Sequence, residues 1–463
     1  MTLKFIADEN IPFISIVGTG YVGLCTAVGF ASKGYKVIAS TRDPEKVASI
    51  NKGIPPFHEP GLQELLQKTI TEGYLRCVLD REEAVLSTDI TFIAVGTPSE
   101  PDGSIDLQYV EGSAREIGES LNKKETYHLV VVKSTVVPGT TENIVKPAIE
   151  KPSSKRCGVD FGLCINPEFL REGSALYDTL HPDRIIIGEY DQKSGDILEN
   201  LYREFYDEKR PPLIRTNLPT AELIKYANNA FLATKIGFIN QIANICEKIP
   251  GADVTAVARG IGLDKRIGPL FLNAGLGYGG SCLPKDVKAL IAFSRSLGYN
   301  PTLFKAAEEV NKAQPHKAVE LCKRLLGNLQ GKRIAILGLA FKPSTDDMRE
   351  AVSIKVINQL LEEGANIVVY DPAATNNAKK IFEDRIEYAP SATKCISGAD
   401  CCILVTEWDE FKGIKPEDFI QHMRQPILID GRRIYDPKQF SQKLKFKAIG
   451  LGELIENGAY SPF

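Results

Sequence analysis

A cysteine in a glycine-rich segment carries the most reactive chemistry in this chain. The segment spans residues 277–286 and reads GYGGSCLPKD, followed by the helix-like VKALI. Pro284 suits the first helical turn, where a missing N–H costs little, so a helix is expected to begin directly after Cys282. The unpaired N–H groups and the dipole at a helix N-terminus favour a thiolate, and they lower a thiol pKa that starts at about 8.5.

An acidic side chain accompanies this cysteine. Asp286 lies one turn after Cys282 and on the same helix face. Such spacing places an activated nucleophile beside an acid/base group, and the glycines would let a substrate approach the backbone closely. The alternative is a buried structural cysteine at a helix cap, because most thiols outside disulfides are small core residues.

Two other pairs of residues have chemically useful spacing. Glu168 and Glu172 lie four apart in NPEFLREG (166–173), after an apolar run at 161–165, and could position substrate or water. Lys225 and Asn229 lie four apart on a predicted helix, hence on one face, and could both donate to a developing oxyanion. Taken alone, each pair is better explained as solvated surface side chains.

The first elements form a βαβ unit. The apolar strand 13–17 leads into Gly18-Thr19-Gly20-Tyr21-Val22-Gly23, then a helix at 24–33 and a strand at 36–39. GxGxxG in this context is typical of a dinucleotide-binding turn. Strands are also predicted at 90–95, before Gly96-Thr97-Pro98, and at 129–133, before Ser134-Thr135. Both end in small polar residues, where open α/β sheets bind ligands.

A long helix and a second α/β region follow. Residues 220–248 have helical apolar spacing and no proline, which predicts a domain-bridging helix or a dimer face. Strand-like runs then recur at 333–337, 366–370, 401–405 and 427–429. We therefore expect an α/β fold of two Rossmann-like domains joined by a long central helix and a helical middle domain. The expected boundaries are 1–215, 216–316 (carrying Cys282) and 317–463.

Composition excludes several functional classes. The 463 residues are 43% hydrophobic and 25% charged, with a net charge of −3, which gives no electrostatic reason to expect nucleic acid or a membrane surface as partner. No apolar run reaches the roughly 18 residues that span a bilayer, and Met1–Pro12 lacks a signal-peptide core. Ten cysteines without CxxC pairs indicate a reducing, cytoplasmic compartment and neither disulfides nor a metal site. Cys401 and Cys402 fall in a predicted buried strand.

Together these segments resemble the UDP-glucose/GDP-mannose dehydrogenase family from about residue 13 to 437. The shared motifs are GTGYVG, the Gly-Thr-Pro at 96–98, Lys133-Ser134-Thr135, NPEFLREG, Lys225 with Asn229, GYGGSCLPKD, and Phe341-Lys342 with TDDMRE at 345–350. The resemblance implies a homodimeric or larger NAD-linked enzyme that oxidises the C6 alcohol of a nucleotide sugar to a carboxylate in two steps.

The resemblance also implies residue roles. Cys282 would form a thiohemiacetal and then a thioester, and the other catalytic residues would be Lys225, Asn229, Asp286, Thr135 and Glu168. Cofactor-binding residues would be Gly18, Gly20, Tyr21, Val22, Gly23, Thr41, Arg42, Gly96, Thr97, Thr135, Glu172 and Arg349. Substrate-binding residues would be Glu168, Phe169, Leu170, Lys225, Asn229, Arg266, Phe271, Gly279, Phe341, Lys342 and Arg432, with Arg266 reaching across a dimer interface.

Two segments favour UDP-glucose as the sugar nucleotide, namely HPDRIIIG at 181–188 and the 261–269 segment that contains Arg266-Ile267-Gly268-Pro269. GDP-mannose oxidation remains the alternative with the same chemistry. A non-catalytic nucleotide-sugar-binding protein on this fold needs no nucleophile, and a simple hydroxyacid dehydrogenase needs no cysteine.

One position departs from the family pattern. The family normally has an Asp after the second strand, where it bonds the adenosine ribose, and this chain has Thr41 there, followed by Arg42 and Asp43. Arg42 could pair with a 2′-phosphate, which makes NADP use plausible beside NAD. Alternatively, Asp43 serves the ribose or Arg42 stacks on the adenine.

Overall fold

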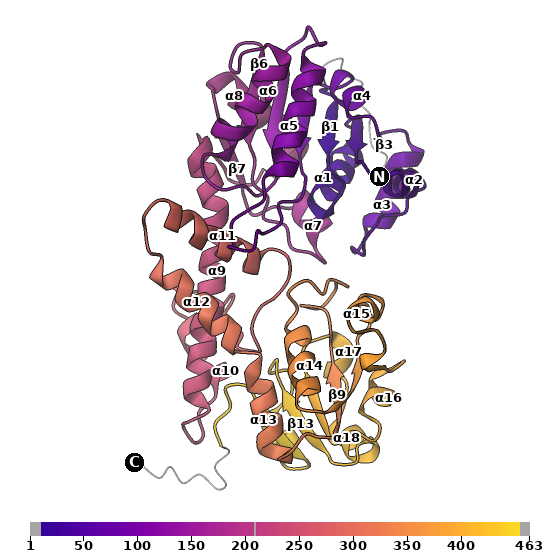
Figure 1. The fold of residues 1–463 in the computed structure, drawn as a ribbon, viewed down its shortest axis with the longest axis vertical. Coiled ribbons are helices and arrows are strands. Elements are labelled where there is room, and N and C mark those ends of the chain that lie inside the picture. The colour runs from indigo at the N-terminus through magenta and orange to yellow at the C-terminus, as the bar shows by residue number, and fades with distance from the viewer. Residues whose placement is uncertain (1–10, 208–209, 454–463) are drawn as a thin grey trace. The chain divides into compact units, whose positions relative to one another are not determined.

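The computed structural model describes residues 11–207 and 210–453. Of the segment 1–12, which was tested for a signal-peptide core, residues 1–10 lie outside the described residues. The chain divides into two compact units, Met1–Ala227 and Asn228–Phe463 (Figure 1). Among the described residues, no helix has the length and apolar character needed to cross a bilayer.

The first unit is built on a sheet in the order β3-β2-β1-β4-β5-β6-β7-β8. Every neighbouring pair is parallel except β6 and β7, which are antiparallel. Its strands are β1 (Ile14–Val17), β2 (Val37–Ser40), β3 (Leu75–Val78), β4 (Ile90–Ile93), β5 (His128–Val132), β6 (Phe161–Ile165), β7 (Ile185–Glu189) and β8 (Leu213–Asn217). Its helices are α1 (Tyr21–Ser32), α2 (Pro44–Asn51), α3 (Leu62–Thr71), α4 (Arg81–Leu86), α5 (Gln108–Leu121), the π-helical η1 (Thr141–Val145), α6 (Lys146–Ser153), α7 (Ala175–Leu180) and α8 (Gln192–Tyr206).

Helices cover both faces of this sheet because its central strands are apolar on both sides. Ile14 and Ile16 pack into one core with residues of α1 and α8. Val17, next along the strand, packs into a second core with Ile117 of α5 and Ile149 of α6. The buried Ser15 and Thr91 hydroxyls bond each other, and strands buried on both faces in this way are typical of a parallel sheet.

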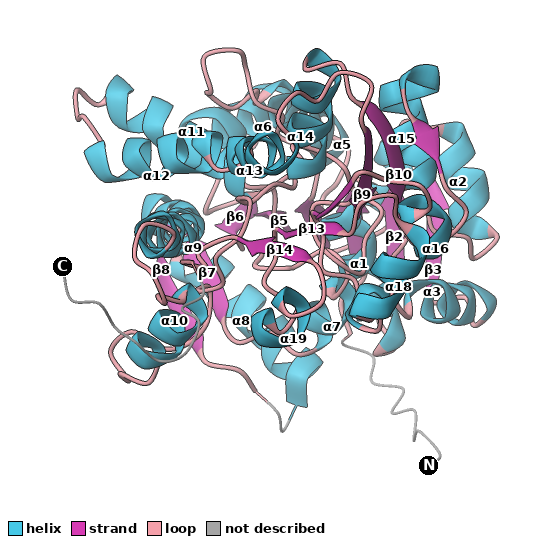
Figure 2. Cartoon of the chain, turned by 90° about the horizontal axis from the view of Figure 1, so that it is seen from below, coloured by secondary structure: helices cyan, strands magenta, loops and turns pink. Residues whose placement is uncertain are grey.

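The second unit begins with helices and ends in a parallel sheet. Helix α9 (Leu218–Cys246) crosses the boundary, and α10 (Val254–Gly262), α11 (Leu283–Ser296), α12 (Thr302–Ala313) and α13 (His316–Leu326) follow. The sheet has the order β11-β10-β9-β12-β13-β14, with strands β9 (Arg333–Leu337), β10 (Asn366–Tyr370), β11 (Glu387–Tyr388), β12 (Cys401–Leu404), β13 (Ile427–Asp430) and β14 (Lys445–Ala448). Its helices are α14 (Val352–Glu362), α15 (Thr375–Phe382), the 3₁₀ turn η3 (Glu383–Arg385), α16 (Ala392–Ile396), α17 (Asp409–Lys412), α18 (Pro416–His422) and α19 (Pro437–Ser441) (Figure 2).

The prediction of two Rossmann-like regions and a long central helix is confirmed. Both sheets contain the strand order 3-2-1-4-5-6 that defines the doubly wound fold. The apolar patterns did not predict the four edge strands β3, β8, β11 and β14, or strand β7. Edge strands have one side open to water, so their apolar runs are short or interrupted by polar residues, as in LRCV and KFKA.

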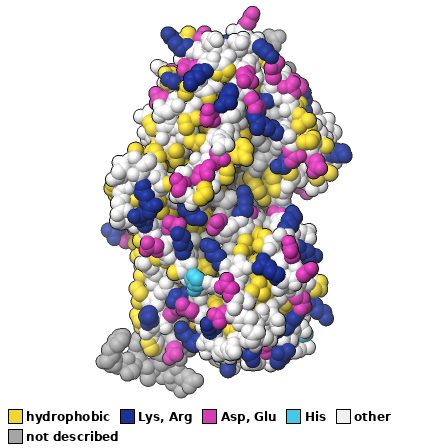
Figure 3. Space-filling model, in the orientation of Figure 1, with side chains coloured by type: hydrophobic (Ala, Val, Ile, Leu, Met, Phe, Trp, Pro, Cys, Tyr) yellow, Lys and Arg dark blue, Asp and Glu magenta, His cyan; other side chains and the backbone are white. Residues whose placement is uncertain are grey.

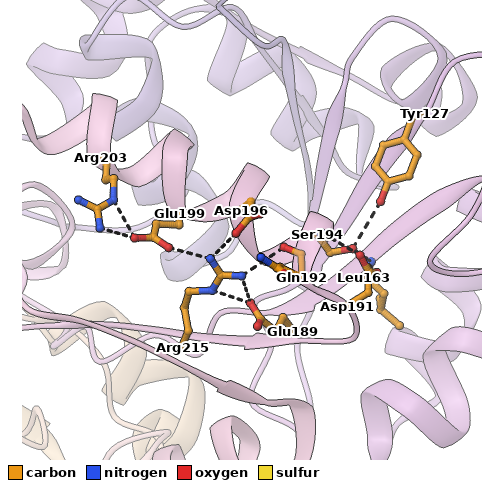
Figure 4. Close-up of polar contacts among 10 residues, drawn as sticks. All are labelled: Tyr127, Leu163, Glu189, Asp191, Gln192, Ser194, Asp196, Glu199, Arg203 and Arg215. Atoms are coloured by element: carbon orange, nitrogen blue, oxygen red, sulfur yellow. Dashed lines mark hydrogen bonds and ion pairs between the residues drawn. The ribbon is translucent and has the colours of Figure 1, made fainter.

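Charges are balanced over the visible surface. On the face drawn in Figure 3, basic and acidic side chains are interspersed, in keeping with the net charge of −3. One compact exception lies at β8, where Arg215 contacts three carboxylates (Figure 4). Its guanidinium donates to Glu189 at 2.7 Å and to Glu199 at 2.9 Å, and it also binds Asp196. This cluster connects α8 to strands β7 and β8 at one end of the sheet.

We predict that Arg215→Met lowers the free energy of unfolding by about 2 kcal/mol, because it removes several charge-assisted hydrogen bonds and leaves three carboxylates facing one another. Arg203→Met is the matched control, since Arg203 is half exposed and pairs with Glu199 of its own helix, α8. Urea unfolding should show a change below about 0.5 kcal/mol for the control. Equal losses in both variants would contradict the assigned role of Arg215.

Candidate active site

Cys282 occupies the position that the sequence predicts, at the start of a helix. It is the N-cap residue of α11, Pro284 lies in the first turn, and the Asp286 N–H donates to the Cys282 carbonyl at 2.9 Å. All ten cysteines lie in the described part of the chain, and Cys282 alone among them is not buried. Burial raises the pKa of the Cys77 thiol, for comparison, to about 11. Exposure and position therefore distinguish Cys282 as a candidate nucleophile.

Gly279 and Gly280, before Cys282, let another segment of the chain approach closely. A Cβ on Gly280 would lie 2.7 Å from the Phe341 ring, and one on Gly279 would overlap the Glu350 carbonyl. The Gly280 N–H donates to the Arg349 carbonyl at 2.9 Å. The close approach that these glycines permit is thus made by the chain itself, through residues 341–350, and not only by a substrate.

Asp286 links the cysteine helix to α9. The Asn229 amide donates to Asp286 Oδ2 at 2.7 Å, and Lys285 Nζ donates to Oδ1 at 2.7 Å. Asn228 in turn donates to Asn229 Oδ1 at 2.9 Å. Asn229 and Asp286 are 5% and 1% exposed, so the alternative interpretation of Asn229 as a solvated surface side chain is wrong.

In the first unit, Lys225 and Glu168 form a buried ion pair. Lys225 Nζ lies 3.0 Å from Glu168 Oε1, and the Leu170 N–H donates to Glu168 Oε2 at 2.6 Å. Both side chains are more than nine-tenths buried. Burial by itself raises the carboxyl pKa, but the Lys225 ammonium more than offsets it, so the pKa of Glu168 lies below its ordinary value.

A second buried lysine, to which the sequence analysis assigned no role, belongs to this cluster. Lys133 Nζ donates to Asn166 Oδ1 at 2.7 Å, and the Tyr202 hydroxyl donates to the same oxygen. Burial lowers the pKa of Lys133 to about 8; the nearby charge of Glu168 acts against this shift, and that of Lys225 adds to it. Its position directly after buried β5, beside Ser134 and Thr135, was the signal that could have identified it.

Aromatic and basic side chains also lie around the Lys225–Glu168 pair. The Arg184 guanidinium stacks over the Phe169 ring at 3.8 Å, and Lys225 Nζ lies 5.5 Å from that ring. A cavity of about 190 Å³ is lined here by Lys133, Asn166, Glu168, Phe169, Leu170 and Arg184, among others.

The GxGxxG turn is shaped to receive a pyrophosphate. Helix α1 begins at Tyr21 after Gly20, which provides no side-chain cap and where an added Cβ would meet no atom within 4 Å. Gly18 has φ +107°, and a Cβ there would overlap the Ala94 carbonyl. Gly23 packs against the Gly18 carbonyl, Val22 packs on the core and Tyr21 stacks on Phe57. An open helix N-terminus next to a glycine turn fits the diphosphate of a dinucleotide.

The other cofactor candidates in the first unit follow strand ends. Gly96 and Thr97 come after β4, and Thr135 after β5; the neighbouring Ser134 hydroxyl donates to the Val95 carbonyl at 2.7 Å. Glu172 lies between β6 and α7, next to Gly173, whose N–H donates to Glu59 at 2.7 Å. Carboxyl ends of parallel strands meet at one sheet edge, where ligands bind.

The residues after β2 use their polar groups within the protein. Arg42 pairs with Glu116, which also binds Arg81, and the Arg42 side chain is 65% exposed. The Asp43 side chain caps α2 by accepting from the Glu45 and Lys46 N–H groups. The Thr41 hydroxyl accepts from the Asp43 N–H at 3.4 Å.

The remaining candidates lie in the second unit. Phe341 and Lys342 follow β9, and Arg349 is held by Asp347 through several hydrogen bonds. Arg432 donates to the carbonyls of Val405 and Gly277 and also pairs with Glu407. Arg266 is 89% exposed and paired with Asp264, in a segment that also exposes Phe271 (φ +64°). Among the described residues, no group of three His, Cys, Asp or Glu side chains is arranged to hold a metal.

Comparison with protein families decides the relationship. The UDP-glucose/GDP-mannose dehydrogenase family matches in three segments: its NAD binding domain at residues 13–206, its central domain at 219–313 and its UDP binding domain at 335–437. The chain belongs to this family. A UDP-glucose 6-dehydrogenase of Haloferax volcanii is 47% identical over 422 residues, covering 91% of this chain and 96% of that protein.

Solved structures agree with this placement. A UDP-glucose dehydrogenase from the hyperthermophilic archaeon Pyrobaculum islandicum is 40% identical, with a TM-score of 0.88, over 97% of this chain and 98% of that one. A GDP-mannose dehydrogenase from Pseudomonas aeruginosa is 35% identical, with a TM-score of 0.54, over 94% of this chain and 99% of that one.

We predict that Lys225→Met destabilises the fold by about 3 kcal/mol at pH 8, because it leaves the Glu168 carboxylate buried without its partner. In the natural protein the low pKa of Glu168 contributes stability above the unfolded pKa, and this is lost as pH falls. In the variant burial dominates, the Glu168 pKa rises, and the loss should therefore be smaller at pH 5.

Chemical unfolding at both pH values measures this effect. The control is the double variant Lys225→Met with Glu168→Gln, which removes the buried charge and should recover most of the stability at pH 8. No recovery would mean that the loss comes from packing of the Lys225 side chain and not from its charge.

Proposed function

We propose that this protein is a UDP-glucose 6-dehydrogenase that uses NAD and makes UDP-glucuronate. The observation that carries the proposal is Cys282 at an open helix start, with Asp286 bonded to Asn229 one helical turn from Lys225 on α9. Binding alone needs no such nucleophile, which argues against a non-catalytic nucleotide-sugar-binding protein. Membership of the family supports the same chemistry.

Both oxidations occur at C6 of the sugar. The glycine turn Gly18–Gly23 would hold NAD, which would supply the hydride acceptor for each oxidation. After the first, the Cys282 thiolate adds to the aldehyde carbon, forming a C–S bond and turning the carbonyl oxygen into an oxyanion. Lys225 and Asn229 donate to that oxyanion, an interaction that strengthens as negative charge develops. Covalent capture retains the aldehyde while the cofactor exchanges.

The second oxidation leaves a thioester, which water cleaves. Attack of water at C6 breaks the C–S bond, which regenerates the Cys282 thiolate and leaves a carboxylate on the sugar. Glu168, ionised beside Lys225, and Thr135 would orient this water, while Asp286 and Lys225 take up and return protons. The balance is one alcohol, one water and two oxidised cofactors, giving one carboxylate, two reduced cofactors and three protons.

Phe169, Leu170, Phe341, Lys342 and the Gly279 backbone would hold the nucleotide sugar. Arg432 would contribute one face of that site, since its contacts with Val405 and Gly277 orient it. We propose UDP-glucose as the substrate, and not GDP-mannose, because several UDP-glucose 6-dehydrogenases are similar to this chain over most of its length. We assign cofactor binding to residues 1–215, the nucleophile to 216–316 and the UDP group to 317–463.

The protein is further proposed to work as a homodimer or larger assembly through α9, in the cytoplasm. Phe231, Phe238 and Ile245 are spaced by seven residues on α9, and each is at least half exposed. Leu263, Leu270 and Phe271 add an exposed apolar segment beside Arg266. Apolar side chains at this spacing favour burial against a second copy, to whose site Arg266 would contribute.

We predict that Cys282→Ala abolishes carboxylate formation, because neither the thiohemiacetal nor the thioester can form. The assay is UDP-glucuronate release with UDP-glucose and NAD, and Cys77→Ala, at a buried thiol of the first unit, is the matched control. Full UDP-glucuronate production by Cys282→Ala would contradict the mechanism, and turnover of GDP-mannose but not UDP-glucose would contradict the substrate.

We predict that NADP is accepted alongside NAD, because Thr41 and Arg42 stand where a carboxylate would repel a 2′-phosphate. Thr41→Asp with Arg42→Ile should shift the preference toward NAD by about 1.5–3 kcal/mol, the range for a hydrogen bond to a charged group. Glu116→Gln, which releases Arg42, should shift it the other way. The ratio of kcat/KM for the two cofactors measures both, and a strong NAD preference left unchanged in all variants would exclude a role for Arg42.

We predict that Phe231→Glu with Phe238→Glu converts the assembly to monomers with little activity, because two buried charges oppose association and Arg266 loses its target. Sedimentation velocity measures the mass, with Leu79→Glu, an exposed apolar position of the first unit, as the control. A fully active monomer of the natural sequence at assay concentration would rule out the assembly.

A further inference from the structure

A carboxylate at the end of the second strand of the C-terminal sheet is unusually heavily bonded. Asp371 follows β10, which is the position where dinucleotide-binding units hold the ribose with an acidic side chain. Here Oδ2 accepts from the Leu339 N–H (2.7 Å), the Ala340 N–H (3.0 Å) and the Trp408 ring N–H (3.0 Å). Oδ1 accepts from the Ala373 and Ala374 N–H groups, each at 2.8 Å.

These bonds leave Asp371 nothing to offer a ribose. A carboxylate has about four lone-pair sites, and five donors of the protein already occupy them. The side chain is 2% exposed. Its position in the fold is that of a cofactor ligand, but its contacts are those of an internal brace.

The connection after β9, the first strand of this sheet, also differs from the corresponding dinucleotide-binding turn after β1. In the first unit, α1 begins at Tyr21, directly after the glycine turn that follows β1. In the second unit, β9 ends at Leu337 and α14 begins only at Val352, so residues 338–351 stand between strand and helix. The helix N-terminus that would receive a pyrophosphate is therefore displaced by a loop.

At the start of this loop, the N–H and the carbonyl of both Leu339 and Ala340 are hydrogen-bonded. Besides the two N–H groups held by Asp371, the Leu339 carbonyl accepts from the Ser353 hydroxyl and the Ala340 carbonyl from the Thr406 hydroxyl, each at 2.6 Å. Further along, Ser344 and Glu350 have φ values of 64° and 51°. Such conformations persist only where the surroundings determine them.

Phe341 and Lys342 come directly after this anchored turn. The Phe341 N–H donates to the Asp347 carbonyl at 3.1 Å, and its ring packs on Gly280, two residues before Cys282. The position of both side chains thus follows from the bonds that hold Leu339 and Ala340.

We propose that Asp371 is a positioning residue that sets the affinity for the nucleotide sugar, and that its saturation excludes a dinucleotide from the C-terminal unit. It holds the 339–340 turn so that Phe341 and Lys342 present a fixed surface to the uridine diphosphate group. The inference rests on the proposed function, which assigns those two residues to the substrate.

The test is Asp371→Asn. In either orientation the amide NH₂ faces at least two N–H donors, so the side chain can no longer brace the 339–340 turn and the 373–374 turn together, while its size is kept. The KM for UDP-glucose should rise about tenfold and the affinity for UDP, measured by calorimetry, should fall by the same factor, as expected for the loss of about one charged hydrogen bond. The KM for NAD should stay unchanged, and kcat should change less than the KM for UDP-glucose.

Asp400→Asn is the matched control. Asp400 is also a buried carboxylate, with 1% of its surface exposed. It lies directly before β12, at the opposite end of the strands from Asp371, and it accepts from the Arg333 N–H and the Arg424 side chain. Thr406→Val is the second variant, since it frees only the Ala340 carbonyl and should raise the KM for UDP-glucose less strongly. It decides the question alone if Asp371→Asn does not fold.

An unchanged KM for UDP-glucose and an unchanged affinity for UDP in the Asp371 variant would overturn the proposal, as would equal effects in the Asp400 control. The UDP measurement separates this outcome from a failure of the proposed function. If the natural protein does not oxidise UDP-glucose, the proposed function fails, whereas a fall in UDP affinity confined to the Asp371 and Thr406 variants still supports the positioning role.

Discussion

The buried ion pair between Lys225 and Glu168 is the interaction on which the candidate site depends. Two charges leave water only if each satisfies the other, so the pair fixes α9 against the loop after β6. The same helix carries Asn229 one turn later, and Asn229 holds Asp286 of the cysteine helix. The first unit thus contributes a cation, and the second an amide and an acid, the three kinds of group that an oxyanion and its proton require.

The second constraint is backbone packing around the cysteine. Gly279 and Gly280 accept no side chain, because Glu350 and Phe341 occupy that space. The C-terminal loop and the cysteine loop are therefore built as one structure, and the loop is anchored in turn by Asp371. One Rossmann-like unit has an open helix start at its glycine turn and the other has a loop there, in keeping with the NAD binding and UDP binding domains of the family that match these regions.

Sequence patterns predicted what depends on local periodicity and short motifs. Buried central strands, the βαβ turn at Gly18 and the helix after Cys282 all follow from nearby residues. Edge strands such as β14 were missed because half of their surface faces water and the apolar pattern breaks. Neither the Asn166 partner of Lys133 nor the most distant donors around Asp371 could be foreseen, since each lies 31 to 37 residues away along the chain.

The central claim is that the substrate is held on Cys282 as a thioester, and trapping that species tests it most directly. Glu168→Gln should slow the attack of water, so acid quenching during turnover with UDP-glucose and NAD should preserve the adduct. Peptide mass spectrometry should then find the UDP-glucuronosyl mass on the peptide that contains Cys282. Formation of UDP-glucuronate by this variant with no added mass at Cys282, or with the mass on another residue, would contradict the account.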